Sequence, residues 1–391
     1  MQRSVSWQTP QETDALELIF GDGCMETSRA DLNPDDVEAL ATEIRNAGPE
    51  TDWSAKLEQR VAELTGYFAC VAVSSGEAAL AHAILGAGVQ PGDEVIVPGY
   101  APVSVADVVV SLRAVPVIVD VDVDETTLHL NVEAVEDSLT DRTRAVIAVH
   151  VGGLATSIDK LASLAERTGL GIIEDTVGAN PGVLNRSRSK RADLLCLRLD
   201  ANSHFPLNRG GIVCTMDSET AARIRLQRLP ASPLVGGPLT LSGHGISQLA
   251  AAWEFFQLAT VRERWRRRCQ IAMTWSAGFG GSNIFQVPAE IPSEPHCWNQ
   301  YTLRLNLQHS SLSRTELVEE LRRQGIGAGI HYLPIHMHER YQRQFGYGAD
   351  TFPVSRNEFL RELTLPINST MSDQDVDLVW TTLTDILRQH T

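Results

Sequence analysis

Four polar side chains that could carry acid–base chemistry stand close together near the middle of the chain. They are Asp200, Asn202, Ser203 and His204, and they follow a short apolar run, Leu194–Leu199. A histidine titrates near neutral pH, so His204 is suited to act as a general base. The neighbouring hydroxyl and amide can donate hydrogen bonds to a developing oxyanion. These groups are the candidate catalytic residues for a cyclisation, elimination, isomerisation or epimerisation.

Asp175 is a fifth candidate, and it stands at the end of an apolar run that begins at Gly171. Its carboxylate could take part in catalysis, or it could be a strand-end cap or an ion-pair partner. Side chains that could bind a polar substrate are spread more widely, and each histidine among them could also be structural. These candidate substrate-binding residues are His150, Arg198, Arg209, His244, His331 and Tyr332.

Short apolar runs alternate with helical patterns, which predicts an α/β domain with a mostly parallel sheet. After the long helical pattern that begins at Ser247, the pattern of predicted strands and helices changes. A smaller α+β domain is predicted there. The predicted domains are an N-terminal tail (1–30), a large α/β domain (31–259) and a small C-terminal domain (260–391). The predicted strands include 68–73, 94–97, 115–119, 145–150, 171–174, 194–199, 211–215 and 300–307, and helical patterns cover 35–64, 76–85, 161–168, 218–229, 247–272, 313–324 and 373–389.

The composition excludes several classes of protein. The net charge of −16 argues against nucleic acid or an anionic membrane as the main partner. No apolar run approaches the roughly 20 residues that cross a bilayer, and no export signal precedes the chain, so a cytoplasmic protein is expected. The six cysteines lack CxxC or metal-finger spacing, and no metal site is predicted. The basic stretch Arg262–Arg268 follows a helical pattern and is predicted to be a solvated helix face.

Several motifs together resemble the DegT/DnrJ/StrS family of sugar aminotransferases. The resemblance implies the fold-type-I scaffold of pyridoxal phosphate (PLP) enzymes and a homodimer with shared active sites. It also implies nucleotide-linked sugars as the usual substrates. The motifs keep the family's order over about residues 30–391: Val73-Ser-Ser-Gly-Glu-Ala-Ala-Leu80, Pro91-Gly-Asp-Glu-Val-Ile-Val-Pro98, Val149-His-Val-Gly-Gly153, Ile173-Glu-Asp175, Gly210-Gly211, Gly325-Ile-Gly-Ala-Gly-Ile-His-Tyr332 and Leu365-Pro366.

The lysine that holds PLP in this family has no counterpart here. Such an enzyme forms an imine between PLP and a lysine, and pairs the pyridine nitrogen with an aspartate. The resemblance implies that Asp175 matches this aspartate. The lysine position falls on Ser203, or on Asn202 after a one-residue shift, and neither side chain can form an imine. The chain has three lysines, and none stands at this position: Lys56, Lys160 and Lys190.

Other departures from the family also concern PLP. Glu77 replaces a threonine beside the phosphate, and two like charges at about 4 Å cost roughly 1–4 kcal/mol. Arg198 replaces a serine that touches the phosphate, and it could pair with Glu77 and fill the pocket. The stacking aromatic aligns with Pro102, although Tyr100 is close enough to replace it. Gly178 and Gly243 replace further contacts. The former PLP pocket therefore comprises Ser75, Gly76, Glu77, Tyr100, Asp175 and Arg198.

Three hypotheses remain open. The favoured one is an enzyme of sugar or natural-product biosynthesis that converts a small-molecule intermediate by acid–base catalysis, with no cofactor. The second is a dehydratase-like enzyme that binds PLP or its amine form (PMP) non-covalently and uses His204 as base on a nucleotide-linked keto-sugar. The third is a non-catalytic subunit that pairs with a true aminotransferase, because a fold alone does not establish a function.

Overall fold

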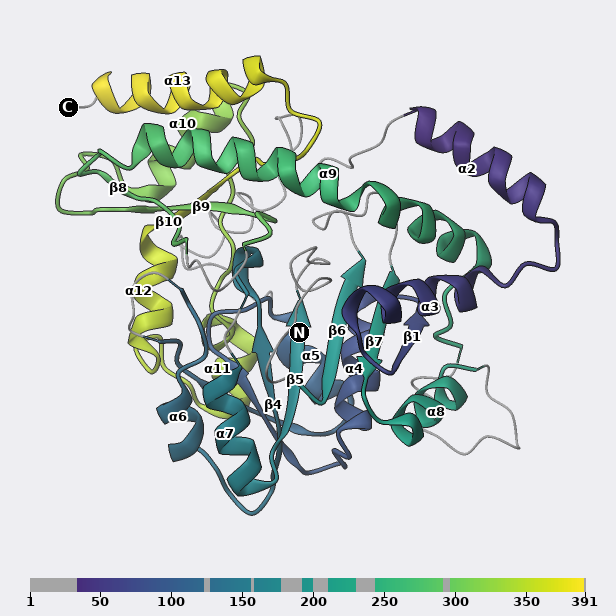
Figure 1. Ribbon diagram of the computed structural model, residues 1–391. Coiled ribbons are helices and arrows are strands. Elements are labelled where there is room, and N and C mark those ends of the chain that lie inside the picture. Colours follow the sequence, from purple (N-terminus) through teal and green to yellow (C-terminus); the bar gives the residue numbers. More distant parts are fainter. Residues whose placement is uncertain are drawn as a thin grey trace, which may run out of the picture.

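A computed structural model describes residues 34–122, 127–155, 158–176, 192–199, 210–229, 243–290 and 296–389. The predicted α/β fold is confirmed, with a large domain built on a seven-stranded sheet and a smaller domain on a three-stranded sheet (Figure 1). Within the described ranges, no helix has both the length and the apolar character that crossing a bilayer requires.

The large sheet is mostly parallel, as predicted, with the strand order β1-β7-β6-β5-β4-β2-β3. Only β7 runs against the other strands, since it pairs antiparallel with both β1 and β6. Helices cover both faces, which explains why β1, β2, β6 and β7 are buried at every position. The strands are β1 (Ala69–Val73), β2 (Glu94–Pro98), β3 (Val115–Val119), β4 (Thr143–Val149), β5 (Gly171–Thr176), β6 (Leu194–Leu199) and β7 (Gly210–Thr215).

Two groups of helices enclose this sheet. The face that carries Val95, Ile147 and Ile173 packs against α4, α5 and α8, and the other face packs against α3, α6, α7 and the first half of α9. The helices are α3 (Trp53–Thr65), α4 (Gly76–Gly86), α5 (Ser104–Ser111), α6 (Val132–Asp137), α7 (Asp159–Thr168), α8 (Ser218–Gln227) and α9 (Gln248–Phe279).

The helical pattern predicted over residues 35–64 is two helices in the structure. The helix α2 (Pro34–Ala47) ends before Gly48, which adopts a φ of 77°. The helix α3 begins after Asp52, whose side chain accepts a hydrogen bond from the Ala55 N–H and caps the helix. A glycine with positive φ followed by an N-cap aspartate is a stop signal and a start signal, so the sequence does contain the break.

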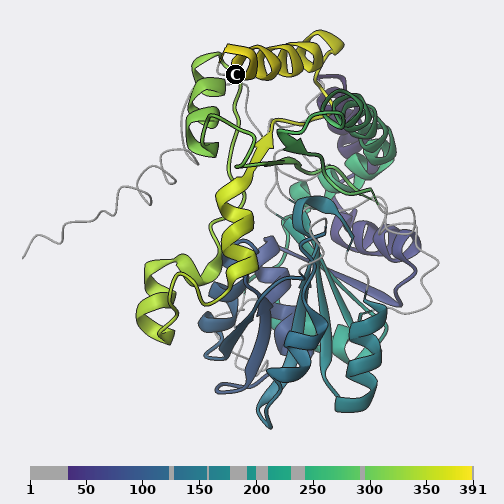
Figure 2. The ribbon, with the colours of Figure 1, turned by 90° about the vertical axis from the view of Figure 1, so that its left-hand side faces the viewer.

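The small domain lies beyond the carboxyl ends of the parallel strands (Figures 1 and 2). Its sheet has the order β10-β9-β8 and packs against α10, α13 and the second half of α9. The long helix α9 therefore belongs to both hydrophobic cores. The elements are β8 (Phe285–Gln286), β9 (Tyr301–Leu305), β10 (Glu362–Leu365), α10 (Arg314–Arg323), α11 (Glu339–Phe345), α12 (Pro353–Arg361) and α13 (Asp373–Gln389), with short 3-10 turns at Val151–Gly153 and Ile335–Met337.

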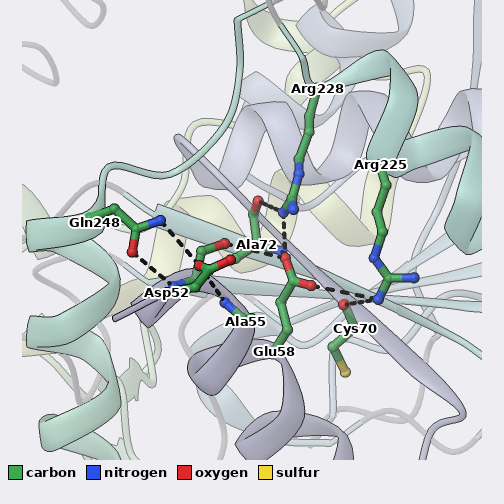
Figure 3. A network of polar contacts seen from close by, with 9 residues as sticks. Asp52, Ala55, Glu58, Cys70, Ala72, Arg225, Arg228 and Gln248 are labelled. Atoms are coloured by element: carbon green, nitrogen blue, oxygen red, sulfur yellow. Dashed lines mark hydrogen bonds and ion pairs between the residues drawn. The ribbon is translucent and has the colours of Figure 1, made fainter. Parts of the chain in front are cut away.

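A buried carboxylate ties α3 to the strand that leads into α4 (Figure 3). Glu58 accepts a hydrogen bond from the Ala72 N–H of β1 at 3.0 Å, pairs with Arg228, and lies 3.5 Å from Nη2 of Arg225. Its side chain is 10% exposed. The network therefore holds β1 against α3 and α8, and the chain passes from the end of β1 into the first turn of α4.

Replacing Glu58 by alanine is expected to lower the free energy of unfolding by about 3–5 kcal/mol, because removing one partner of a buried ion pair leaves the other charge uncompensated. Urea denaturation measures this change. The matched control is Glu63→Ala on the same helix, where the pair with Arg60 is about half exposed (48% and 52%), so a loss of no more than about 1 kcal/mol is expected. Equal losses for both variants would contradict the structural role of Glu58.

Candidate functional site

The carboxyl ends of β5 and β6 bring charged side chains to the start of α4. Asp175 in β5 pairs with Cys196 in β6, so Arg198 lies two residues further along β6 on the same face of the sheet. That face is covered by α4, whose first residues are Gly76 and Glu77. The topology therefore gathers Asp175, Arg198 and Glu77 at the edge where open α/β sheets bind their ligands.

Arg198 forms a two-point ion pair with Asp175. Its Nε donates to Oδ1 of Asp175 at 2.8 Å, and its Nη2 donates to Oδ2 at 2.6 Å. The side chains are buried, at 5% exposed for Arg198 and 0% for Asp175. A planar guanidinium that faces a carboxylate at two points makes one of the stronger charge-assisted contacts in proteins. Both oxygens of Asp175 are thus bonded to a cation that the chain itself supplies.

The remaining nitrogen of Arg198 reaches the mouth of the pocket. Nη1 lies 3.4 Å from Oε1 of Glu77 and donates to Oγ of Ser104 at 3.4 Å. The predicted pairing of Arg198 with Glu77 is confirmed, although Asp175 is the closer partner. Glu77 is 55% exposed and lies in the first turn of α4, where the helix dipole favours a carboxylate.

Arg198 also fills the space over the start of α4. A Cβ atom at Gly76 would lie 2.7 Å from Cγ of Arg198, so the arginine stem packs directly on the glycine. Ser75 caps the helix, with its Oγ accepting a hydrogen bond from the Ala78 N–H at 3.0 Å. The first turn of α4 is therefore covered by the chain's own side chains.

The described residues do not fit PLP. Its pyridine nitrogen needs a carboxylate that is not already paired at both oxygens, and its phosphate needs hydrogen-bond donors where Glu77 presents a carboxylate. Its aldehyde needs a lysine amine. Lys56 and Lys160 are exposed on α3 and α7, which cover the opposite face of the sheet. Lys190 lies outside the described residues.

The candidate catalytic segment is anchored at this same edge. Leu199 and Gly210 pair across β6 and β7, so the segment between them leaves and re-enters the sheet at the carboxyl end of β6, directly after Arg198. Its own residues lie outside the described part of the chain, and their roles stay predictions. They are the candidate catalytic residues Asp200, Asn202, Ser203 and His204, and the candidate substrate-binding Arg209.

Tyr100 belongs to the contact between the two domains. It is fully buried, its hydroxyl donates to the His331 carbonyl at 2.8 Å, and it accepts from the Tyr332 N–H at 3.1 Å. It belongs to the same hydrophobic cluster as Trp275 and Tyr301 of the small domain. Tyr100 is thus a buried residue of the contact between the domains in this structure, and its suggested role as a replacement for the family's stacking aromatic stays a prediction.

His150 is buried beside a carboxylate that the sequence interpretation missed. Its Nε2 lies 3.0 Å from Oε1 of Glu174, and the two side chains are 1% and 0% exposed. Glu174 precedes Asp175 in β5, so the two carboxylates point to opposite faces of the sheet. Because neighbouring residues in a strand point to opposite faces, the sequence alone predicts that Glu174 and Asp175 lie on different faces of the sheet. Whether His150 contacts a substrate stays a prediction.

The remaining described candidate residues are His244, His331 and Tyr332. The His244 carbonyl accepts from the Ser74 N–H at 2.8 Å, which holds this segment against the end of β1. Burial lowers the pKa of His331 to about 4, so its imidazole is neutral at pH 7. The Tyr332 hydroxyl accepts from Nε2 of Gln300 at 3.0 Å. His331 and Tyr332 therefore take part in the contact between the domains.

Two other features of the structure bear on where a site could lie. In the described part of the chain, no group of three or more His, Cys, Asp or Glu side chains is placed to hold a metal ion. A surface hollow of about 710 Å³ lies at the amino edge of the large sheet, with Gly86, Asp193 and Asp217 among its walls. Among the described candidate residues none lines this hollow, so the carboxyl edge remains the candidate site.

Comparisons with known proteins agree with this fold. The sequence profile of the DegT/DnrJ/EryC1/StrS aminotransferase family matches residues 32–384. The spore coat polysaccharide biosynthesis protein SpsC of Bacillus subtilis is 30% identical over 366 residues, which cover 90% of this chain and 93% of SpsC. The structure of S. venezuelae DesV in complex with a ketimine intermediate has a TM-score of 0.79 at 26% identity, covering 90% of this chain and 94% of DesV. NtdA of Bacillus subtilis with bound PMP has a TM-score of 0.80 at 19% identity, covering 92% and 83% of the chains.

Proposed function

The chain belongs to the DegT/DnrJ/EryC1/StrS aminotransferase family, and we propose that it is a biosynthetic enzyme that works without PLP. Its substrate is a small intermediate of sugar or natural-product biosynthesis, and its reaction is a cyclisation, elimination or isomerisation. It acts as a homodimer whose active sites are shared between the subunits, the arrangement that its family implies.

The observation that carries this proposal is the two-point ion pair of Arg198 with Asp175. The carboxylate that would hold the pyridine nitrogen is occupied at 2.6 and 2.8 Å by a buried guanidinium. The sequence adds that no lysine stands between β6 and β7. Both requirements of a PLP enzyme are therefore unmet, and they are unmet in neighbouring parts of one site.

The chemistry then falls to the segment that follows β6. His204 removes a proton from the substrate, and Ser203 and Asn202 donate hydrogen bonds to the oxygen that gains negative charge. Asp200 is the nearby carboxylate that can orient the imidazole. Asp175 is paired with Arg198. The role of Asp175 is therefore to position the positive charge of Arg198 at the carboxyl end of β6, and not to exchange a proton.

The purified protein is expected not to bind PLP. A titration with PLP to millimolar concentration should give no cofactor absorption band that belongs to the protein and no heat of binding by calorimetry. Binding of PLP or PMP would contradict the proposal and support the dehydratase-like alternative. NtdA of Bacillus subtilis, whose structure holds bound PMP, is the positive control for the assay.

The substitution His204→Ala should lower kcat on the pathway substrate by about 10²- to 10⁴-fold, which is the usual contribution of a general base. The matched control is His309→Ala, because His309 is an exposed histidine in the small domain and its loss should leave kcat unchanged. An unaltered rate for His204→Ala would remove this residue from the mechanism. Activity that appears only with a lysine-bearing aminotransferase present would favour the non-catalytic subunit.

A further inference from the structure

A small polar cavity lies between the two domains, close to the carboxyl end of β4. Its volume is about 40 Å³, and its walls include Leu128 and Gly152 from the large domain and Gln300, Arg304 and Glu362 from the small domain. A void of this size holds one or two small polar groups, not a sugar ring. It is also part of the candidate site's surroundings, because Gly152 follows the end of β4, which pairs with β5 at Asp175.

Two side chains at this cavity have hydrogen-bonding capacity that the described protein groups do not use. Glu362 is 1% exposed, and neither of its carboxyl oxygens has a hydrogen-bond partner. Gln300 is 8% exposed and uses its Nε2 for Tyr332, while its Oε1 has no partner. Buried polar atoms without a partner cost about 1–3 kcal/mol each. Both residues line one void, so these unpartnered oxygens indicate that the void suits a group that forms hydrogen bonds.

Arg304 also lines the cavity and carries hydrogen-bond donors. It lies beside Glu362 in the β9–β10 pair, and its Nε donates to Oε2 of Glu358 at 2.5 Å. Because Arg304 lines the cavity, a cationic guest would meet a positive charge there. Burial raises the pKa of Glu362 to about 8, although the positive charge of Arg304 favours the ionised form. The Tyr100 hydroxyl has one proton and donates it to the His331 carbonyl, so it does not serve as a donor to Glu362. At pH 7 Glu362 is therefore mostly neutral, and it offers no net charge to attract an ammonium group.

We infer that this cavity is a subsite for one neutral hydroxyl group of the substrate, held by Glu362, Gln300 and Arg304. A hydroxyl both donates and accepts, so it can donate to Oε1 of Gln300, accept from the Arg304 guanidinium, and bond to the Glu362 carboxyl, which has an acceptor oxygen and, when protonated, an O–H donor. The inference rests on the proposed function, because it requires a substrate in the adjoining cleft. It names Glu362 as a specificity-determining residue that lies away from the former cofactor pocket.

Crystals of the full-length protein soaked in ethylene glycol or in methylammonium chloride test the subsite directly. Ethylene glycol is expected in the cavity, with an oxygen within hydrogen-bonding distance of Glu362 and Gln300, and methylammonium is expected to stay out. The isosteric variant Glu362→Gln should keep the bound glycol, whereas Glu362→Leu should lose it. The control Glu319→Gln, on the exposed side of α10, should bind as the parent protein does.

Two outcomes would overturn the inference. Entry of methylammonium in place of ethylene glycol would make the cavity a cation site. Water alone in every soak, whatever the additive, would make it a hydration site with no part in recognition. If Glu362→Leu does not fold, the soaks of the parent protein and of Glu362→Gln still decide between these outcomes. Neither probe is PLP and neither experiment needs turnover, so failure here is distinguishable from failure of the PLP-free proposal.

Discussion

The double variant Arg198→Ser, Glu77→Thr should bind PLP non-covalently, whereas the parent protein should not. The serine and threonine are the residues that the family carries at these positions. Removing Arg198 frees both oxygens of Asp175 for the pyridine nitrogen and opens the space over Gly76, where the arginine stem now packs. Removing Glu77 takes away the carboxylate that would repel the phosphate. Absorption spectroscopy and calorimetry of the purified variant measure the binding.

The stability of this variant offers a second measurement. Without PLP, Asp175 is a buried carboxylate that has lost its partner, which costs about 3–5 kcal/mol. PLP binds the folded state only, so PLP at a concentration of 100 times its Kd should raise the free energy of unfolding by about 2.7 kcal/mol. The melting temperature should therefore rise with PLP in the double variant and stay constant in the parent protein. The single variant Glu77→Thr is the control, since Arg198 still closes its pocket and PLP should not stabilise it.

Failure of the double variant to bind PLP, in a protein shown to be folded, would mean that Arg198 and Glu77 are not what excludes the cofactor. The explanation would then have to come from other positions, such as Pro102 or Gly178. Binding by the double variant would show that the pocket keeps the shape of a cofactor site and that an internal cation closes it.

Most of the large domain could be predicted from the sequence. The strands Val115–Val119 and Leu194–Leu199 have the predicted bounds. Buried parallel strands are short apolar runs with clear ends, so local composition is enough to find them. The contact between Arg198 and Glu77 was also predictable, because both residues replace partners of one phosphate. The pairing of Arg198 with Asp175 was not foreseen, since it depends on the register of β5 against β6, which no local pattern contains.

The burial of part of the basic stretch in α9 could not be predicted in the same way. Arg264 and Arg268 lie in the basic stretch that was expected to be a solvated helix face, yet they are 7% and 2% exposed. The α9 helix runs through both cores, so one of its faces meets the small domain, and Nη1 of Arg268 donates to the Trp298 carbonyl at 3.2 Å. Composition identifies charge, but it does not identify which face of a long helix another domain will cover.

Asp175 and Arg198 should depend on each other for stability far more than two independent residues would. Each single substitution, Asp175→Leu or Arg198→Met, should lower the free energy of unfolding by about 3–5 kcal/mol, because each leaves one buried charge without its partner. The double substitution removes both charges and should cost much less than the sum, since buried ion pairs replaced by apolar residues of similar size are often close to neutral. Urea denaturation of the four proteins gives the coupling energy.

The pH dependence of Arg198→Met separates this explanation from a simple loss of packing. With its cation gone, the Asp175 carboxyl is buried without a partner, so its pKa in the folded state should rise above its value in the unfolded state. A raised folded-state pKa gives stability that is present at low pH and lost as the pH increases. The loss caused by Arg198→Met relative to the parent protein should therefore be larger at pH 8 than at pH 5. The double variant Asp175→Leu/Arg198→Met has no carboxyl group left to titrate at this position. Its loss of stability relative to the parent protein should therefore be the same at pH 5 and pH 8. A loss that is the same at both pH values in the single variant would mean that Arg198 stabilises the protein by filling space, and the charge-based account of PLP exclusion would lose its main support.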